Sequence, residues 1–295
     1  MKLTFPHMGY SYVAFKMLIE DLGYEVVVPP EPSKRTMDLG VRYSPEFSCI
    51  PFKVLLGTFL ETIEMGAEVG ISSGGVGPCR AGYYSIMQQK IINELGHDFK
   101  ILSFEPPQSN YLDFIKKLWM IKPKRMSWRT FIQLIKKGYK KLEITDEIEF
   151  LMYRYMPYEI NKGDTAKAFK TALDMLDEAQ TVDDIEDARW EGIKVLAKVP
   201  QDRSQTPLKI GIIGEIYVVL EHAVNFCIQK NLGEMGVYTD RSIWLTSYAE
   251  KNVFVEGREG ERDVFQMAHP YLNEMIGGHG INSIGEIVIY AKDGY

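Results

Sequence analysis

The stretch 2–30, KLTFPHMGYSYVAFKMLIEDLGYEVVVPP, predicts a strand, a helix and a second strand in that order. Its first four residues are typical of a short buried strand, which Pro6 ends. A helix is predicted over 11–22, because apolar residues recur along one face and Gly23 follows as a C-terminal cap. The run EVVVPP at 25–30 predicts the next strand, ended by its two prolines. This β-α-β order is typical of a parallel sheet.

The same alternation continues through the first third of the chain. Helices are predicted over 51–65 and 83–95, and strands over 68–72 and 99–104. We therefore predict an N-terminal α/β domain at 1–108, with a doubly wound parallel sheet of the Rossmann or flavodoxin type.

Residues 109–205 are predicted to form a helical segment, because long amphipathic patterns replace the strand patterns. Charge is segregated within it: 109–141 holds ten Lys and Arg against one acid, and 142–191 holds fourteen acids against five Lys and Arg. Two interpretations stay open. The two stretches are solvated helical faces that pair with each other, or they form a docking surface for CoA phosphates or for an acidic partner protein.

A second α/β domain of the parallel type is predicted at 206–295. Its elements are a strand over 208–214 (LKIGIIG), a helix over 216–232, a strand over 237–244, and a helix that Ser283 caps and that runs to about Lys292. A doubly wound domain would continue into a further strand at this point. We therefore expect this second domain to be truncated.

Composition argues against several classes of protein. The chain has 295 residues, 45% hydrophobic and 25% charged, which is typical of a globular protein of about two domains. Its net charge of −6 argues against nucleic-acid binding, which needs a basic surface. Because the sequence shows neither a membrane span nor a signal peptide, we expect a cytoplasmic protein. Three widely spaced cysteines do not form a disulfide framework.

Two of these cysteines lie in similar settings. Cys49, in RYSPEFSCIPFK at 42–53, and Cys79, in SSGGVGPCRAGYY at 72–84, each follow a loop and precede a predicted helix. A helix N-terminus presents free N–H groups and positive potential, which favour a thiolate or an anionic cluster. Plain buried cysteines are the alternative, since the spacing matches neither zinc nor ferredoxin motifs. Cys227 is predicted to be a core residue inside a helix.

The glycine-rich loop before Cys79 is a second candidate binding feature. Gly74, Gly75 and Gly77 would let the backbone approach a bulky cofactor, or cradle a phosphate at the start of the next helix. The loop does not match the common glycine motifs of nucleotide-binding proteins. Arg80 would contact an anion or hydrogen-bond a cluster sulfide, or else it is a surface arginine.

Two residues of the second domain are candidate catalytic groups. Glu215 follows the strand 208–214, so it should point into the crevice at the carboxyl ends of the strands. His279 lies in GGHG at 277–280 and would act as a proton donor or a ligand, or else as a structural residue of a glycine-rich loop.

This chain combines the phrases FPHMG, VVPPEPSKRTMDLGVRYSPEFSCIPFK, GGVGPCRAGYY, FEPP, GEIY and GGHGINSIGE. As a set they resemble the 2-hydroxyacyl-CoA dehydratase superfamily. They look most like its single-chain branch of CoA protein activase and activase-related proteins, which is related to the double-cubane cluster proteins. The phrases lie toward both ends of the chain, and the helical middle matches more loosely.

The resemblance implies two Rossmann- or flavodoxin-like domains with helical additions and an iron–sulfur cluster between them, either 4Fe–4S or double-cubane. Cys49 and Cys79 stand at the ligand positions of the family's S-C-I-P and G-P-C-R motifs. The family usually supplies a further cysteine beyond an A-K-D-G motif, found here at 291–294, and this chain stops at Tyr295. We therefore expect the two cysteines to be only part of the ligand set.

The resemblance also implies a function. An ATP-dependent activase of the actin/Hsp70-like type would supply one low-potential electron, and the chain would reduce or dehydrate an acyl-CoA or another small molecule. A homodimer or heterodimer is expected, because the family uses pairs of such subunits. The alternative is a non-redox protein that kept the fold and binds CoA or a nucleotide. A glycosyltransferase-like enzyme is a weaker alternative, since no sugar-nucleotide site is evident.

Overall fold

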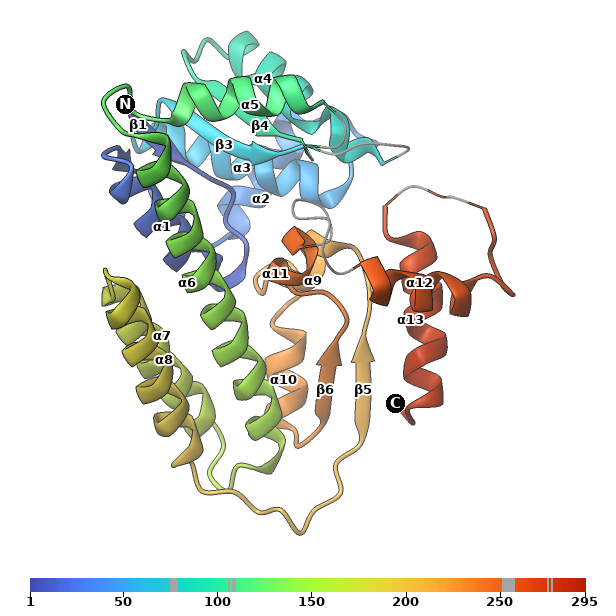
Figure 1. The fold of residues 1–295 in the computed structure, drawn as a ribbon. Coiled ribbons are helices and arrows are strands. Elements are labelled where there is room, and N and C mark those ends of the chain that lie inside the picture. Colours follow the sequence, from blue (N-terminus) through green and yellow to red (C-terminus); the bar gives the residue numbers. More distant parts are fainter. Residues whose placement is uncertain (75–78, 106, 108–109, 251–257, 275, 277) are drawn as a thin grey trace. The chain divides into compact units, whose positions relative to one another are not determined.

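The chain forms two compact units in the computed structural model, which describes residues 1–74, 79–105, 107, 110–250, 258–274, 276 and 278–295 (Figure 1). Unit 1 comprises Met1–Ile135 with Ile276–Gly278, and unit 2 comprises Lys136–Met275 with His279–Tyr295. The division falls within helix α6 (Trp128–Tyr155), so the predicted helical segment 109–205 is shared between the units. The fold is mixed α/β with parallel sheets, as the sequence predicts.

A four-stranded parallel sheet forms the centre of unit 1. Its strands are β1 (Lys2–Thr4), β2 (Glu25–Val26), β3 (Val69–Ser73) and β4 (Lys100–Phe104), in the order β2-β1-β3-β4. This is the order of flavodoxin-like sheets. Each strand coincides with a predicted one, although β2 ends at Val26 rather than at the prolines.

Helices cover both faces of this sheet. They are α1 (Tyr12–Asp21), α2 (Lys34–Tyr43), α3 (Ile50–Glu64), α4 (Tyr84–Glu94) and α5 (Tyr111–Ile121), with the short 3-10 helices η1 (Gly9–Ser11) and η2 (Arg80–Tyr83). Ile19 of α1 packs against Leu3 on one face. Phe59 of α3 and Ile92 of α4 pack with Phe99 in a second apolar cluster. Burial of these side chains drives the layered packing.

The sequence patterns did not predict α2. Its N-terminus is a capping box, in which the Ser33 side chain accepts from the Thr36 N–H and the Thr36 hydroxyl accepts from the Ser33 N–H. Two glycines let α2 and α3 cross closely. A Cβ on Gly40 would lie 1.9 Å from the Lys53 carbonyl oxygen, and one on Gly57 would lie 2.0 Å from that of Thr36. The helix is therefore fixed by a capping signal and a close crossing rather than by an apolar stripe.

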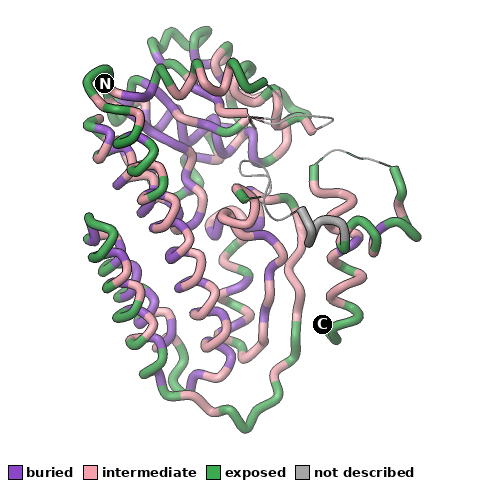
Figure 2. The backbone as a smooth tube through the Cα atoms, viewed as in Figure 1, coloured by how far each residue is buried: buried purple, intermediate pink, exposed green. Residues whose placement is uncertain are grey.

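Unit 2 contains a two-stranded parallel sheet, β5 (Lys209–Ile212) and β6 (Tyr238–Arg241) (Figure 1). Its helices are the second part of α6, η3 (Met156–Tyr158), α7 (Asp164–Glu178), α8 (Val182–Ala197), α9 (Ile216–Leu220), α10 (Ile228–Glu234), α11 (Leu245–Ala249), α12 (Arg258–Ala268) and α13 (Gly280–Lys292). Buried and exposed residues alternate along α7 and α8 (Figure 2), so each helix has one packed and one exposed side.

The prediction of one helix over 216–232 was wrong. The chain leaves α9 after Leu220 and begins α10 at Ile228. Phe226 and Cys227 have φ values of 59° and 52°, a left-handed conformation that an α-helix does not contain. Asn225 fixes the turn, because its side-chain amide donates to two carbonyl groups at the end of α9. Cys227 is therefore a half-buried turn residue and not a core residue of a helix.

The last helix begins earlier than predicted. It starts at Gly280 with His279 at the N-cap position, and Ser283 already donates its N–H to the His279 carbonyl, at 2.8 Å. Ser283 therefore lies inside the first turn and does not cap it. Gly294, with φ of 78°, follows the helix as predicted. None of the helices in the described part of the chain is both long and apolar enough to cross a membrane.

Candidate functional site

Cys49 lies at the N-cap position of α3. Its backbone is extended, with φ −62° and ψ 153°, and Pro51 sits in the first turn, where a missing N–H breaks no helical hydrogen bond. The free N–H groups and the positive end of this fifteen-residue helix therefore lie next to Cys49. The cysteine is half-buried.

Cys79 occupies the equivalent position before η2, which leads directly into α4. Its backbone is also extended, with φ −72° and ψ 133°, and it too is half-buried. The two cysteines thus share their backbone conformation, their burial and their place before a helical segment.

Arg80 joins the two cysteine loops within unit 1. Its Nη1 donates a hydrogen bond to the Phe47 carbonyl, at 3.0 Å. Arg80 directly follows Cys79, and Phe47 lies two residues before Cys49. Arg80, which the sequence suggests as an anion contact, therefore joins the two cysteine loops.

The helices behind the cysteines are joined as well. Gln88 of α4 donates through Nε2 to the carbonyl of Phe52 in α3, at 3.1 Å, in a buried position. The ring of Phe52 meets that of Tyr84 edge to face, with centroids 5.3 Å apart. Both contacts join residues near the start of α3 and of α4. The N-termini of the two helices therefore lie close together in unit 1.

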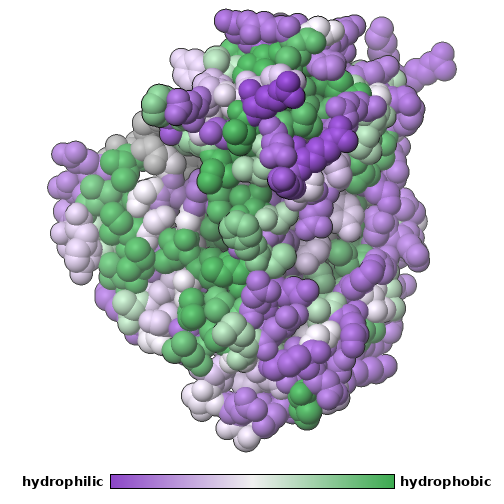
Figure 3. Space-filling view, turned by 180° about the vertical axis from the view of Figure 1, so that it is seen from behind, coloured by the Kyte–Doolittle hydropathy of each residue, from purple (hydrophilic) through white to green (hydrophobic). Residues whose placement is uncertain are grey.

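Exposed apolar side chains flank both cysteines. Phe47 and Ile50 lie beside Cys49, and Tyr83 lies just after Cys79; Phe47 is 86% exposed and Tyr83 70%. Scattered apolar residues are normal on a protein surface, and Figure 3 shows hydrophobic residues among hydrophilic ones on the far side of the molecule. Here the exposed apolar side chains lie next to the two cysteines in the chain, which makes this surface a candidate contact surface.

Of the glycine-rich loop, only Gly74 can be placed, since Gly75 and Gly77 lie outside the described residues. The Gly74 N–H donates to the Phe104 carbonyl, at 2.8 Å, and continues the pairing of β3 with β4. A Cβ on Gly74 would lie 2.7 Å from Cγ of Glu105. A larger residue here would displace the side chain of Glu105.

The two predicted catalytic residues lie in unit 2. Glu215 follows β5, and its Oε2 accepts the Val218 N–H at 3.0 Å, so the carboxylate caps α9. His279 precedes α13, and its ring lies 6.0 Å from that of Tyr248. The structure thus gives Glu215 a structural role and places His279 against an aromatic ring.

Unit 2 contains a buried ionic network that the sequence does not predict. Both Nη atoms of Arg241, at the end of β6, donate to the Glu149 carboxylate of α6 at 2.8 Å, and His222 Nε2 lies 2.9 Å from Oε1 of Glu149. Burial raises the pKa of Glu149, but Arg241 and then His222 outweigh it and lower that pKa to about 2. No local signal predicts this network, because 73 and 92 residues separate the partners in the chain.

Asp146 lies one helical turn before Glu149 on α6. Its Oδ2 accepts from the Thr246 N–H at 3.0 Å and from the Thr246 hydroxyl at 2.7 Å. Burial nevertheless raises the pKa of Asp146 to about 6. The structure contains no group of three or more His, Cys, Asp or Glu side chains arranged to bind a metal ion, within the residues that it describes.

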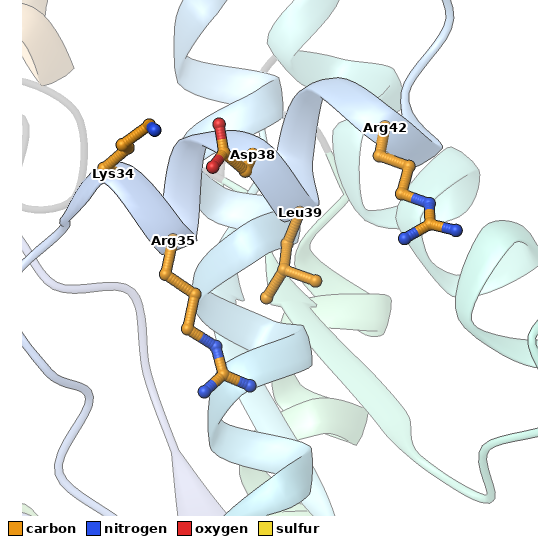
Figure 4. A pocket seen from close by; sticks show the side chains of 5 residues that line it. All are labelled: Lys34, Arg35, Asp38, Leu39 and Arg42. Atoms are coloured by element: carbon orange, nitrogen blue, oxygen red, sulfur yellow. The ribbon is translucent and has the colours of Figure 1, made fainter.

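An open hollow of about 350 Å³ lies along α2. It is lined by Lys34, Arg35, Asp38, Leu39 and Arg42 (Figure 4). Arg35 already contacts α3, through a hydrogen bond to Glu64 and an Nε that lies 3.8 Å from Glu61. Lys34 and Arg42 remain as the cations that an anionic ligand in this hollow would meet.

Residues 7–69 match the family described as CoA enzyme activase uncharacterised domain. This segment of the chain is therefore similar to a domain of the CoA enzyme activases. No curated protein matches it. The activase-like region runs from His7 to Val69, so it contains the α2 hollow and Cys49 but ends before Cys79. This match supports the relation to the CoA activase and 2-hydroxyacyl-CoA dehydratase superfamily that the motifs indicate.

Proposed function

We propose that Cys49 and Cys79 bind an iron–sulfur cluster, and that the chain is an electron-accepting component of the 2-hydroxyacyl-CoA dehydratase type. The observation that carries this proposal is the pairing of two equivalent cysteine loops through Arg80 and Phe47. Two thiolates fit part of such a site, because a cluster needs about four protein ligands.

Each described residue of the site would have a definite task. The N-terminal N–H groups of α3, next to Cys49, would face the negative charge of a bound cluster, and the Arg80 guanidinium would add a positive charge between the two cysteine loops. The buried contacts between α3 and α4 would hold the two thiolates in a constant relation. A bound cluster would supply one-electron reduction at low potential.

The proposal includes a partner and a substrate. An ATP-dependent activase of the actin/Hsp70-like type would deliver the electron, and the exposed side chains of Phe47, Ile50 and Tyr83 would lie in or beside its contact surface. The substrate would be an acyl-CoA or a small molecule that is dehydrated or reduced.

The test is the iron and sulfide content of the anaerobically reconstituted chain. We expect stoichiometric iron and sulfide with broad visible absorbance, and loss of most of both in Cys49→Ser and in Cys79→Ser. Cys227→Ser is the matched control and should keep the cluster, because Cys227 lies in a turn of unit 2. Circular dichroism of each variant checks the fold. A colourless wild-type chain, or equal iron in all three variants, would contradict the proposal.

A second candidate function rests on the α2 hollow, in which Lys34 and Arg42 could meet the phosphates of CoA or of a nucleotide. In that case the chain would be a non-redox binding protein. CoA should then raise the midpoint of thermal unfolding in the absence of iron, and Arg42→Ala should abolish the effect. Lys90→Ala, which removes an exposed cation of α4, should not. An unchanged midpoint with CoA would exclude this candidate.

A further inference from the structure

Helix α5 carries large apolar residues on its outer side. Its inner side packs on the sheet, because the ring of Phe114 lies 6.0 Å from that of Phe104 in β4 and Ile121 is buried. On the outer side, Leu112 is 81% exposed and Trp119, two turns later, is 61% exposed. A helix with apolar residues on two sides normally packs on both, so the outer side of α5 is a candidate contact surface.

The ring of Trp119 is held in place although it is exposed. It meets the ring of Trp128 in α6 edge to face, with centroids 5.2 Å apart. The Lys122 ammonium lies near both rings, 6.0 Å from the Trp119 centroid and 5.5 Å from that of Trp128. It also donates to the carbonyls of Pro123 and Met126 in the turn between the two helices. The turn and the exposed ring are therefore preorganised for contact.

Four exposed cations surround this ring. They are Lys116 of α5, Lys124 and Arg125 of the following turn, and Arg129 at the start of α6. None of these four side chains forms an ion pair within the described part of the chain. The acid of α5, Asp113, pairs with Lys117 instead. We call Leu112, Trp119 and the four cations the basic face.

Positive charge is concentrated in this part of the sequence. Of the chain's 34 Lys and Arg, ten lie in 109–141, together with one of its 40 acids. Lys140 and Lys141 of this run are used within unit 2, where Lys140 pairs with Glu186 at 2.9 Å and Lys141 donates to two backbone carbonyls. The basic face instead leaves its charge to the solvent in an otherwise acidic chain, which favours a partner of negative charge.

We propose that the basic face binds the surface of a membrane that contains anionic lipids. The four cations would meet the negative headgroups. Leu112 and Trp119 would enter the boundary between headgroups and acyl chains, where tryptophan is enriched and where helices with basic and apolar residues bind.

Two other anionic partners fit the face less well. Nucleic acid would meet the cations and stack bases on a flat ring, but the strongly exposed Leu112 offers no ring. An acidic protein would bury the centre of the face, and lysines such as Lys116 are depleted at the centre of protein interfaces. At a membrane, a lysine keeps its ammonium among the headgroups while its aliphatic stem lies along the apolar layer.

Co-sedimentation with vesicles tests the charge part of this proposal. We expect the chain to bind vesicles that contain phosphatidylglycerol and not vesicles of phosphatidylcholine alone, and to bind about tenfold more weakly when the salt concentration rises from low to high. Lys116→Glu with Arg125→Glu should weaken binding about 100-fold. Lys90→Glu with Lys162→Glu is the matched control, because it reverses two exposed cations outside the basic face and should leave binding unchanged. Circular dichroism of each variant checks the fold.

Tryptophan fluorescence tests the apolar part. Acyl chains labelled with bromine should quench part of the emission when the chain binds phosphatidylglycerol vesicles. Trp119→Phe should remove the quenched part, because it removes the ring that enters the membrane. Trp190→Phe, which changes a tryptophan of unit 2 that is 53% exposed, should keep it.

Three results would overturn the proposal. A chain that does not bind phosphatidylglycerol vesicles at low salt would show that the face does not recognise lipid. Binding that both charge-reversal pairs weaken equally would show that it depends on overall charge and not on the basic face. Binding without quenching of Trp119 would mean that charge alone holds the chain at the surface, as expected for a site that takes an acidic protein.

Discussion

At the scale of single residues, two carboxylates of α6 give unit 2 opposite contributions to its pH dependence. Glu149 is stabilised as a carboxylate by Arg241, so its contribution to stability is complete above its ordinary pKa of 4.5 and is lost as pH falls toward about 2. Asp146 behaves in the opposite way. Burial raises its pKa from 3.8 to about 6, so the folded state binds the proton more tightly and stability falls as pH rises between these values.

Asp146→Asn should therefore stabilise the protein at pH 7.5 by about 2 kcal/mol, and by much less at pH 4.5. The amide oxygen can still accept the hydrogen bonds from Thr246, and no charge is buried. Urea unfolding at the two pH values measures the effect. Asp98→Asn, the same change at an exposed position, is the control. It should change the free energy of unfolding only slightly at pH 7.5 and at pH 4.5. An equal gain for Asp146→Asn at both pH values would disprove the assigned pKa.

At the scale of elements, the crossing of α2 and α3 depends on the absence of side chains. Gly40 and Gly57 place each helix against a backbone carbonyl of the other, and a carbonyl cannot move aside as a flexible side chain can. The same crossing positions α3 and therefore Cys49 at its N-terminus. The close packing of α2 on α3 therefore helps to fix the position of Cys49.

Gly57→Ala should destabilise the protein by about 2–3 kcal/mol, because the new Cβ would lie 2.0 Å from the Thr36 oxygen and the helices must separate. Gly214→Ala is the matched control. There the Cβ would lie 3.2 Å from a side-chain carbon of Val219, which can shift, and the cost should stay below about 1 kcal/mol. Denaturant midpoints compare the two variants, and equal losses would show that the crossing tolerates a methyl group.

At the scale of the whole molecule, α6 is shared between two units that have separate cores. The network of Glu149, His222 and Arg241 belongs entirely to unit 2, and the glycine crossing belongs entirely to unit 1. Each unit therefore has its own determinant of stability.

Hydrogen exchange should separate the two units. Glu149→Gln leaves the buried Arg241 with a neutral partner and should cost about 3 kcal/mol, with faster exchange in 136–250 and little change in 1–74. Gly57→Ala should give the reverse pattern. Faster exchange throughout the chain in either variant would mean that the units unfold together.

The sequence alone determined the four strands of unit 1, the helices α1, α3 and α4, and the matching positions of Cys49 and Cys79. Apolar periodicity, strand-ending prolines and helix caps are local signals, because they act between residues a few positions apart. The same signals failed at α2, where charged residues obscure the pattern, and over 216–232, where the Asn225 side chain ends one helix and the chain turns.

Only the tertiary structure decided which distant residues meet. It paired the cysteine loops through Arg80 and Phe47, which are 33 residues apart. It also assembled Glu149 with Arg241 across 92 residues. Such contacts depend on how the cores pack, and no local pattern of residues encodes that packing.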